Sequence, residues 1–181
     1  MKILKYILIL SLWFSGYLSY AQKYKSVSGE AGFFSSAPLE DIKAQNKTAT
    51  GLFDSETGSV AFVVPIKGFR FRKSLMQEHF NENFMESDKY PQGTFEGKIS
   101  GYDLNTSGEQ DAVAEGKMTI HGVTQNVRIP GKFRNENNRI TMEAVFPVKL
   151  EDYDISIPRV LFMNIAEEVD VTVRFIFEKA G

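Results

Sequence analysis

Histidine is the side chain that most often performs acid–base chemistry near neutral pH, and this sequence contains two. His79 lies close to Glu78 and Glu82, so it could act as a general base or contribute to a metal site. A histidine in the core or at its boundary, with one hydrogen bond, is the commoner case, and we favour it. His121 precedes Gly122, and this pair suits a two-residue turn that requires positive φ angles. Neither histidine therefore predicts an active site.

The sequence lacks the motifs of nucleophilic and metal-dependent enzymes. It has no cysteine, no Gly-x-Ser-x-Gly motif and no His-Glu-x-x-His motif. Glu151, Asp152 and Asp154 form an acidic cluster that could bind calcium weakly, but the cluster lacks the glycine and the ligand spacing of a dedicated calcium loop. We therefore expect a protein that is not an enzyme and that has no metal or other cofactor.

Three cations, Arg70, Arg72 and Lys73, stand close together and could neutralise the phosphate or pyrophosphate headgroup of a ligand. A solvated strand end is the simpler interpretation, and we prefer it. The chain has a net charge of −2, which becomes about −4 if Lys2 and Lys5 are removed with the N-terminal segment described below. Such a charge gives no reason to expect nucleic acid or an anionic membrane surface as a partner.

Residues 69–99 combine three structural signals in an order that few folds need. Residues 69–72 alternate like the end of a half-buried strand, and Ser74-x-x-Gln77 has the form of a capping box, which predicts a helix start near Leu75. The helix should end before Pro91, after which residues 94–99 resume an alternation of period two. One amphipathic helix is thus inserted between two strands. Its apolar face consists of Leu75, Met76, His79, Phe80 and Phe84.

The N-terminal residues 1–21 are typical of a secretory signal peptide. Lys2 and Lys5 precede an apolar run, and small residues stand at Ser19 and Ala21, where a cleavage site is expected. A transmembrane anchor is the alternative, but the apolar run is shorter than the roughly 20 residues that span a bilayer. We expect cleavage after Ala21 and an exported mature chain, residues 22–181, with no transmembrane segment. Its oligomeric state cannot be inferred from the sequence.

The mature chain should form one domain, because no linker, repeat or change of composition divides it. Residues 60–66, 140–148 and 169–177 each alternate with one apolar face, as half-buried strands do. Short turn sequences separate such runs, which favours a meander. Roughly eight strands spaced in this way predict an all-β, antiparallel barrel with the helix at one end or across an opening. A β-sandwich remains an alternative.

Three segments of the sequence resemble those of a known family. They are Tyr90-Pro91-x-x-Thr94-Phe95, residues 116–124 (GKMTIHGVT) and residues 148–155 (VKLEDYDI), and together they resemble the YceI-like family. The resemblance implies an eight-stranded antiparallel lipocalin-like barrel, exported to the bacterial periplasm, whose tunnel holds a long polyisoprenoid chain. Many members have an Arg-Asp pair just before the helix histidine, whereas here residues 76–78 (MQE) precede His79. We therefore transfer no headgroup contacts.

Inward-facing side chains on the strands and the apolar face of the helix are the candidates for ligand contact. Met76, Phe80 and Phe84 could form an adaptable lid over the tunnel mouth, although a plain docked helix would have the same pattern. Gly97, Gly101 and Gly116 could leave room inside the barrel or mark bulges. The candidate contact residues are Phe62, Val64, Phe71, Met76, Phe80, Phe84, Phe95, Met118, Met142, Phe146, Phe175 and Phe177.

The sequence leaves open whether the barrel is hollow. Fifteen phenylalanines among 181 residues could fill the interior completely, as happens in many small barrels. We expect an exported, non-enzymatic protein that binds a long-chain apolar ligand such as a polyisoprenoid, a quinone or a similar lipid. The alternative is a filled barrel that binds no ligand and acts through its surface as a stress-related or envelope interaction protein.

Overall fold

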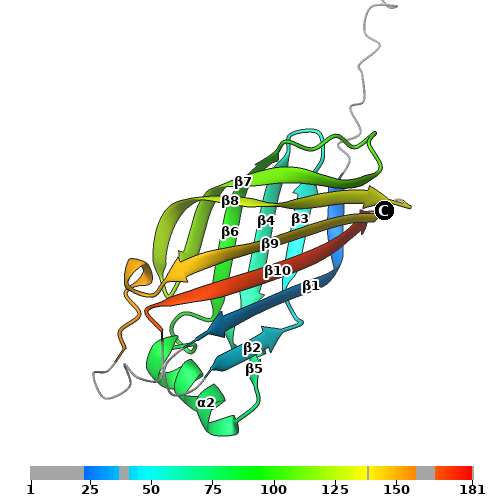
Figure 1. The fold of residues 1–181 in the computed structure, drawn as a ribbon. Coiled ribbons are helices and arrows are strands. Elements are labelled where there is room, and N and C mark those ends of the chain that lie inside the picture. Colours follow the sequence, from blue (N-terminus) through cyan, green and yellow to red (C-terminus); the bar gives the residue numbers. More distant parts are fainter. Residues whose placement is uncertain (1–22, 37–40, 138, 158–165, 181) are drawn as a thin grey trace, which may run out of the picture.

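The structure is a computed structural model that describes residues 23–36, 41–137, 139–157 and 166–180. The expected signal peptide, residues 1–21, lies outside the described residues. Ten strands and four short helical segments are found in the described chain (Figure 1). The strands are β1 (Lys23–Ser35), β2 (Ile42–Asn46), β3 (Thr50–Asp54), β4 (Ser59–Pro65), β5 (Arg70–Phe71), β6 (Gln92–Ser100), β7 (Gly108–Ile120), β8 (Val123–Glu136), β9 (Arg139–Lys149) and β10 (Glu168–Lys179). The helical segments are η2 (Ile66–Gly68), α2 (Ser74–His79), the π-helical η3 (Phe80–Phe84) and η4 (Glu151–Tyr153).

Eight of these strands form a closed antiparallel barrel in the order β1-β3-β4-β6-β7-β8-β9-β10. The barrel closes where β1 pairs with β10, from Tyr24 opposite Lys179 to Phe34 opposite Asp170, with a bulge between Ser26 and Ser28. A closed barrel leaves no unpaired strand edge around the ring. The expected all-β, eight-stranded barrel with one inserted helix is confirmed, and the alternative of a sandwich is wrong.

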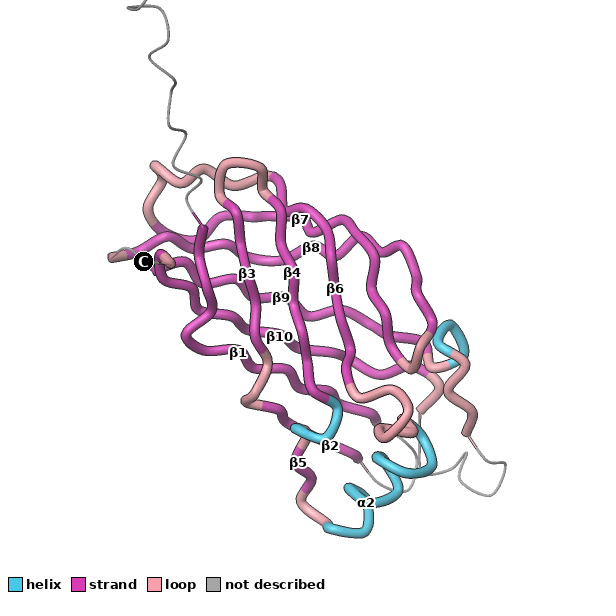
Figure 2. Tube along the Cα trace, turned by 180° about the vertical axis from the view of Figure 1, so that it is seen from behind, coloured by secondary structure: helices cyan, strands magenta, loops and turns pink. Residues whose placement is uncertain are grey.

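A small flap formed by β2 and β5 extends from one end of the barrel (Figures 1 and 2). The first residues of β1 pair with β3, whereas residues 31–35 pair with β2 instead. β5 adds to the free side of β2, and the chain then continues into α2. This arrangement places the helix at the same end of the barrel as the flap.

The β7–β8 connection is a two-residue turn. His121 has a φ of 51° and Gly122 a φ of 78°, as the sequence predicted for this pair. A Cβ atom at Gly122 would lie 2.4 Å from the ring of Tyr90, so the turn packs tightly against the segment that leads into β6. His121 contributes the other half of this contact, with its ring centroid 4.6 Å from that of Tyr90.

The expected capping box at the start of the helix is wrong. The helix begins after Lys73, and no side chain caps its first turn. Gln77, the expected reciprocal partner of Ser74, instead accepts a hydrogen bond from the backbone N–H of Phe71 at 3.4 Å. Gln77 therefore attaches the helix to β5, and Ser74 does not cap the helix.

Of the three glycines that the sequence suggested could leave room or mark bulges, two mark a close approach of strands. Gly97 on β6 lies directly opposite Gly116 on β7. A Cβ atom at Gly97 would lie 2.3 Å from the carbonyl oxygen of Glu115, and one at Gly116 would lie 2.3 Å from that of Glu96. The third, Gly101, has a φ of 89° at the end of β6, a conformation that favours glycine. All three are required by the backbone.

Candidate functional site

The barrel encloses an apolar cavity of about 570 Å³. Val171 and Val173 lie in the middle of β10 and face inward, yet both are only partly buried. Phe62 and Val64 show the same combination on β4. Inward side chains in the middle of a filled barrel would be fully buried, because interiors normally pack without voids larger than a water molecule. The barrel is therefore hollow at this level.

Small side chains create much of this space. Ala31, Ala112, Ala114 and Ala144 come from β1, β7 and β9, and all four border the cavity. Ala31 and Ala144 flank Val173 of β10 from its two neighbouring strands. None of these alanines is among the side chains that the sequence predicted as ligand contacts, although the inward phase of their strands could have identified them.

The mouth of the cavity lies beneath the helix. α2 and η3 contain no fully buried residue, and Leu75, which borders the cavity, is 59 % exposed. Phe80 is the main anchor of this segment, because its ring centroid lies 5.0–5.5 Å from those of Phe33, Phe69 and Phe71. The helical segment is thus held over the mouth chiefly by one aromatic cluster.

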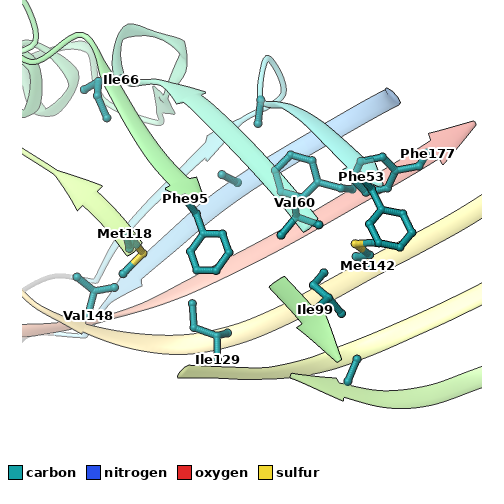
Figure 3. Packing of buried hydrophobic residues seen from close by; sticks show 14 of the residues in the cluster. Phe53, Val60, Ile66, Phe95, Ile99, Met118, Ile129, Met142, Val148 and Phe177 are labelled. Atoms are coloured by element: carbon teal, nitrogen blue, oxygen red, sulfur yellow. The ribbon is translucent and has the colours of Figure 1, made fainter. Parts of the chain in front are cut away.

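The opposite end of the barrel is filled. Phe53, Phe133 and Phe177 have almost no exposed surface, and their rings lie in edge-on contact with Phe53 at the centre. Tyr24 and Tyr102 complete this cluster, which we call the aromatic plug. Figure 3 shows the order along the interior, from Ile66, Met118 and Val148 at one end through Phe95 to Phe53 and Phe177 at the other.

Eleven of the twelve side chains that the sequence predicted as ligand contacts border the cavity. They are Phe62, Val64, Phe71, Met76, Phe80, Phe84, Phe95, Met118, Met142, Phe146 and Phe175. Phe177 is not among the residues that border the cavity and packs in the aromatic plug instead. Phe33 and Phe69 also border the cavity and were missed. Contact of any of these side chains with a ligand stays a prediction.

Among the described residues, six that border the cavity have polar or charged side chains: Ser35, Lys73, Thr94, His79, Lys132 and Glu143. The charges of two of them are engaged elsewhere, since Lys132 Nζ lies 2.8 Å from Asp111 and Glu143 lies 2.6 Å from Arg174. Ser35 is buried and accepts a hydrogen bond from the N–H of Ala166. Lys73 and His79 both lie at the mouth.

The structure corrects or limits three sequence interpretations of charged residues. His79 is exposed at the mouth and is not a core or boundary residue. Arg70 donates hydrogen bonds to the carbonyl oxygens of Lys67 and Phe69, which fits the preferred interpretation of a strand end. In the described part of the chain, no three histidine or acidic side chains converge as metal ligands, the acidic residues of 151–154 included.

A polar network joins the turn at His121 to two loops near the mouth. His121 Nδ1 lies 3.1 Å from the carbonyl oxygen of Tyr153, and its Nε2 lies 3.5 Å from Glu86. Gln125 donates a second hydrogen bond to this loop, at the carbonyl oxygen of Asp152. Tyr153 itself is buried, and burial together with the nearby Asp152 carboxylate raises the pKa of its phenol to about 12. These contacts fix η4 against the barrel wall.

Comparison with known proteins assigns the fold to a family. The family model described as "YceI-like domain" matches residues 22–177. A polyisoprenoid-binding domain from Saccharophagus degradans has a TM-score of 0.74 at 15% identity, covering 87% of this chain and 98% of its own. The BcnA protein of Burkholderia cenocepacia has a TM-score of 0.69 at 17% identity, with 82% and 95% covered. The YceI protein of Campylobacter jejuni has a TM-score of 0.63 at 15% identity, with 79% and 87% covered.

No curated protein sequence matches the chain. Within the residues that the structure describes, no helix has the length and apolar character needed to cross a bilayer. The match of the family model over most of the chain agrees with the closed barrel and with the similar solved structures. The chain belongs to the family of YceI-like domains.

Proposed function

We propose that this protein is exported to the periplasm and binds a long-chain apolar ligand, such as a polyisoprenoid, a quinone or a similar lipid, without catalysing a reaction. The observation that carries the proposal is the cavity, whose inward side chains are aliphatic or aromatic and stay partly exposed in the middle of the barrel. Such a surface gains from contact with an apolar chain, because burial of apolar area is worth roughly 25 cal/mol per Å².

The name of one structural neighbour supports the ligand class. The Saccharophagus degradans domain is described as polyisoprenoid-binding, and nearly the whole of that domain aligns with this chain. The rival role, a filled barrel that acts only through its surface, is disfavoured by the hollow middle of the barrel. Export is supported by the signal-peptide pattern of residues 1–21.

Native mass spectrometry of the protein purified from a bacterial host tests the proposal. We expect a chain that begins at Gln22 and carries an added mass, which organic extraction should identify as an apolar lipid. An intact N-terminus would contradict export, and a well-folded protein without added mass or extractable lipid would contradict ligand binding.

A matched pair of variants shows whether any bound lipid lies in the cavity. Ala114→Phe places a large ring in the cavity, whereas Ala61→Phe places the same ring on the outer face of β4, since Ala61 alternates with the inward Val60 and Phe62. We expect the first variant to lose the added mass and the second to retain it. Equal retention in both variants would place the ligand elsewhere.

A further inference from the structure

Phe133 separates the hollow part of the barrel from the filled part. Phe133 is among the residues that border the cavity, and it is fully buried. Its ring stacks on Tyr102, with the centroids 4.4 Å apart and the planes 18° from parallel, and meets Phe53 at 6.2 Å. Neither Tyr102 nor Phe53, both in the described chain, borders the cavity. The cavity is therefore a blind pocket that ends at Phe133.

The two ends of this pocket differ in polarity. Lys73 and His79 border the mouth, and both are exposed to solvent there. Ile99, Ala112 and Met142 border the closed end around Phe133. Lys132 and Glu143, the sequence neighbours of Phe133 and Met142, also border the cavity, but their charged ends form ion pairs with Asp111 and Arg174. A polar group pushed to the closed end would lose its hydration without a hydrogen-bond partner. A ligand with one polar end should therefore enter with its apolar end first.

The depth of the pocket is finite. The inward residues of β10 from Val169 to Phe175 all border it, a stretch of about 20 Å along the strand. With the usual tilt of barrel strands, this corresponds to about 15 Å along the axis. A chain longer than the pocket must leave its remaining length at the mouth, where it gains little burial.

From this geometry we infer that Phe133 is a stop that sets the length of chain the cavity accepts, with Tyr102 holding its ring in place. The inference rests on the proposed function and adds to it the direction of entry and the residue that determines ligand length. Ala112 on β7 lies opposite Gly131, close to the stop, so a larger side chain there should shorten the pocket.

A homologous series of straight-chain 1-alkanols tests the inference with the purified, delipidated protein. Each methylene buried should raise affinity by up to about fourfold, until the chain reaches Phe133 and further lengthening adds little. A plot of affinity against chain length should therefore show a break for the wild-type protein. A steady rise through the whole series would overturn the inference, because the pocket would then have no closed end.

Three variants and one control locate the stop. Phe133→Leu should move the break to longer chains, and Ala112→Leu should move it to shorter ones. Tyr102→Ala keeps the test available if Phe133→Leu does not fold, because it removes the support behind the ring while Phe133 stays in place. Ala61→Leu adds the same atoms as Ala112→Leu on the outer face and should leave the break unchanged.

The outcomes separate this inference from the proposed function. In one outcome, 1-alkanols bind but the break stays at the same length, both in Ala112→Leu and in whichever of Phe133→Leu and Tyr102→Ala folds. Phe133 is then not the stop, and the proposed binding function stands. If no 1-alkanol binds at any length and no lipid copurifies, both the stop and the proposed function are wrong.

Discussion

Replacing Gly97 with alanine should destabilise the barrel strongly, whereas the same change at Gly93 should not. Both glycines face inward on β6, four residues apart. A Cβ atom at Gly97 would lie 2.3 Å from the Glu115 carbonyl oxygen, whereas one at Gly93 would meet no atom closer than 3.8 Å. The two substitutions therefore add the same methyl group to the same strand and differ only in the space available.

The magnitude follows from the distances. A carbon normally stays about 3.3 Å or more from a carbonyl oxygen, so β6 and β7 must separate by roughly 1 Å near Gly97. That shift stretches the hydrogen bonds on either side of the Gly97–Gly116 pair, and we expect a loss of about 2 to 4 kcal/mol in the free energy of unfolding. Gly93→Ala should be neutral or stabilising by about 0.5 to 1 kcal/mol, because alanine restricts the unfolded chain more than glycine does.

Urea denaturation measures both changes as shifts of the midpoint at constant slope. Gly116→Ala should cost about as much as Gly97→Ala, and the double variant should cost less than the sum, since one separation of the strands accommodates both methyl groups. Equal midpoints for Gly97→Ala and Gly93→Ala would refute the reasoning, because the close approach of the strands would then have no energetic weight.

Two further predictions concern the helix start and a buried phenol. Ser74→Ala should change the free energy of unfolding by less than about 0.5 kcal/mol, because Ser74 does not cap the helix. A loss of about 1 kcal/mol or more in urea denaturation would show instead that Ser74 does cap the helix. Burial raises the pKa of Tyr153 from 10.0 to about 12. Between these two values the unfolded chain loses the phenol proton while the folded protein keeps it, so the phenol's contribution to stability is complete below pH 10 and is lost as the pH rises toward 12. Tyr153→Phe should therefore lose less stability than the wild type between about pH 9 and about pH 11, and equal losses in the two proteins would contradict the assignment.

The features predicted well from the sequence depend on local pattern. Alternation of period two in residues 169–177 identified β10 and its inward face, because each residue's side of a strand is set by its neighbours in sequence. The turn at His121 and Gly122 was predicted for the same reason, since φ preferences belong to single residues.

The features predicted poorly depend on strands that are distant in sequence. Phe175 and Phe177 share one inward face and are both buried, yet Phe175 borders the cavity and Phe177 does not. The difference arises because β3 supplies Phe53 at the level of Phe177. The predicted capping box was wrong for a similar reason, since the backbone N–H of Phe71 on β5 donates a hydrogen bond to the side chain of Gln77. Such competition between partners cannot be inferred from spacing alone.

The pairing of β1 with β10 also constrains how the chain can fold. These two strands are separated in sequence by all the other strands of the ring, and ten residue pairs from Tyr24–Lys179 to Phe34–Asp170 join them. The barrel therefore cannot close before β10 has been synthesised, and until then β1 and the last strand formed both present open edges that can pair with other chains. Contacts of such long sequence separation form slowly. A partly synthesised chain is thus the form of this protein most prone to aggregation, and closure of the ring removes both edges in a single late step.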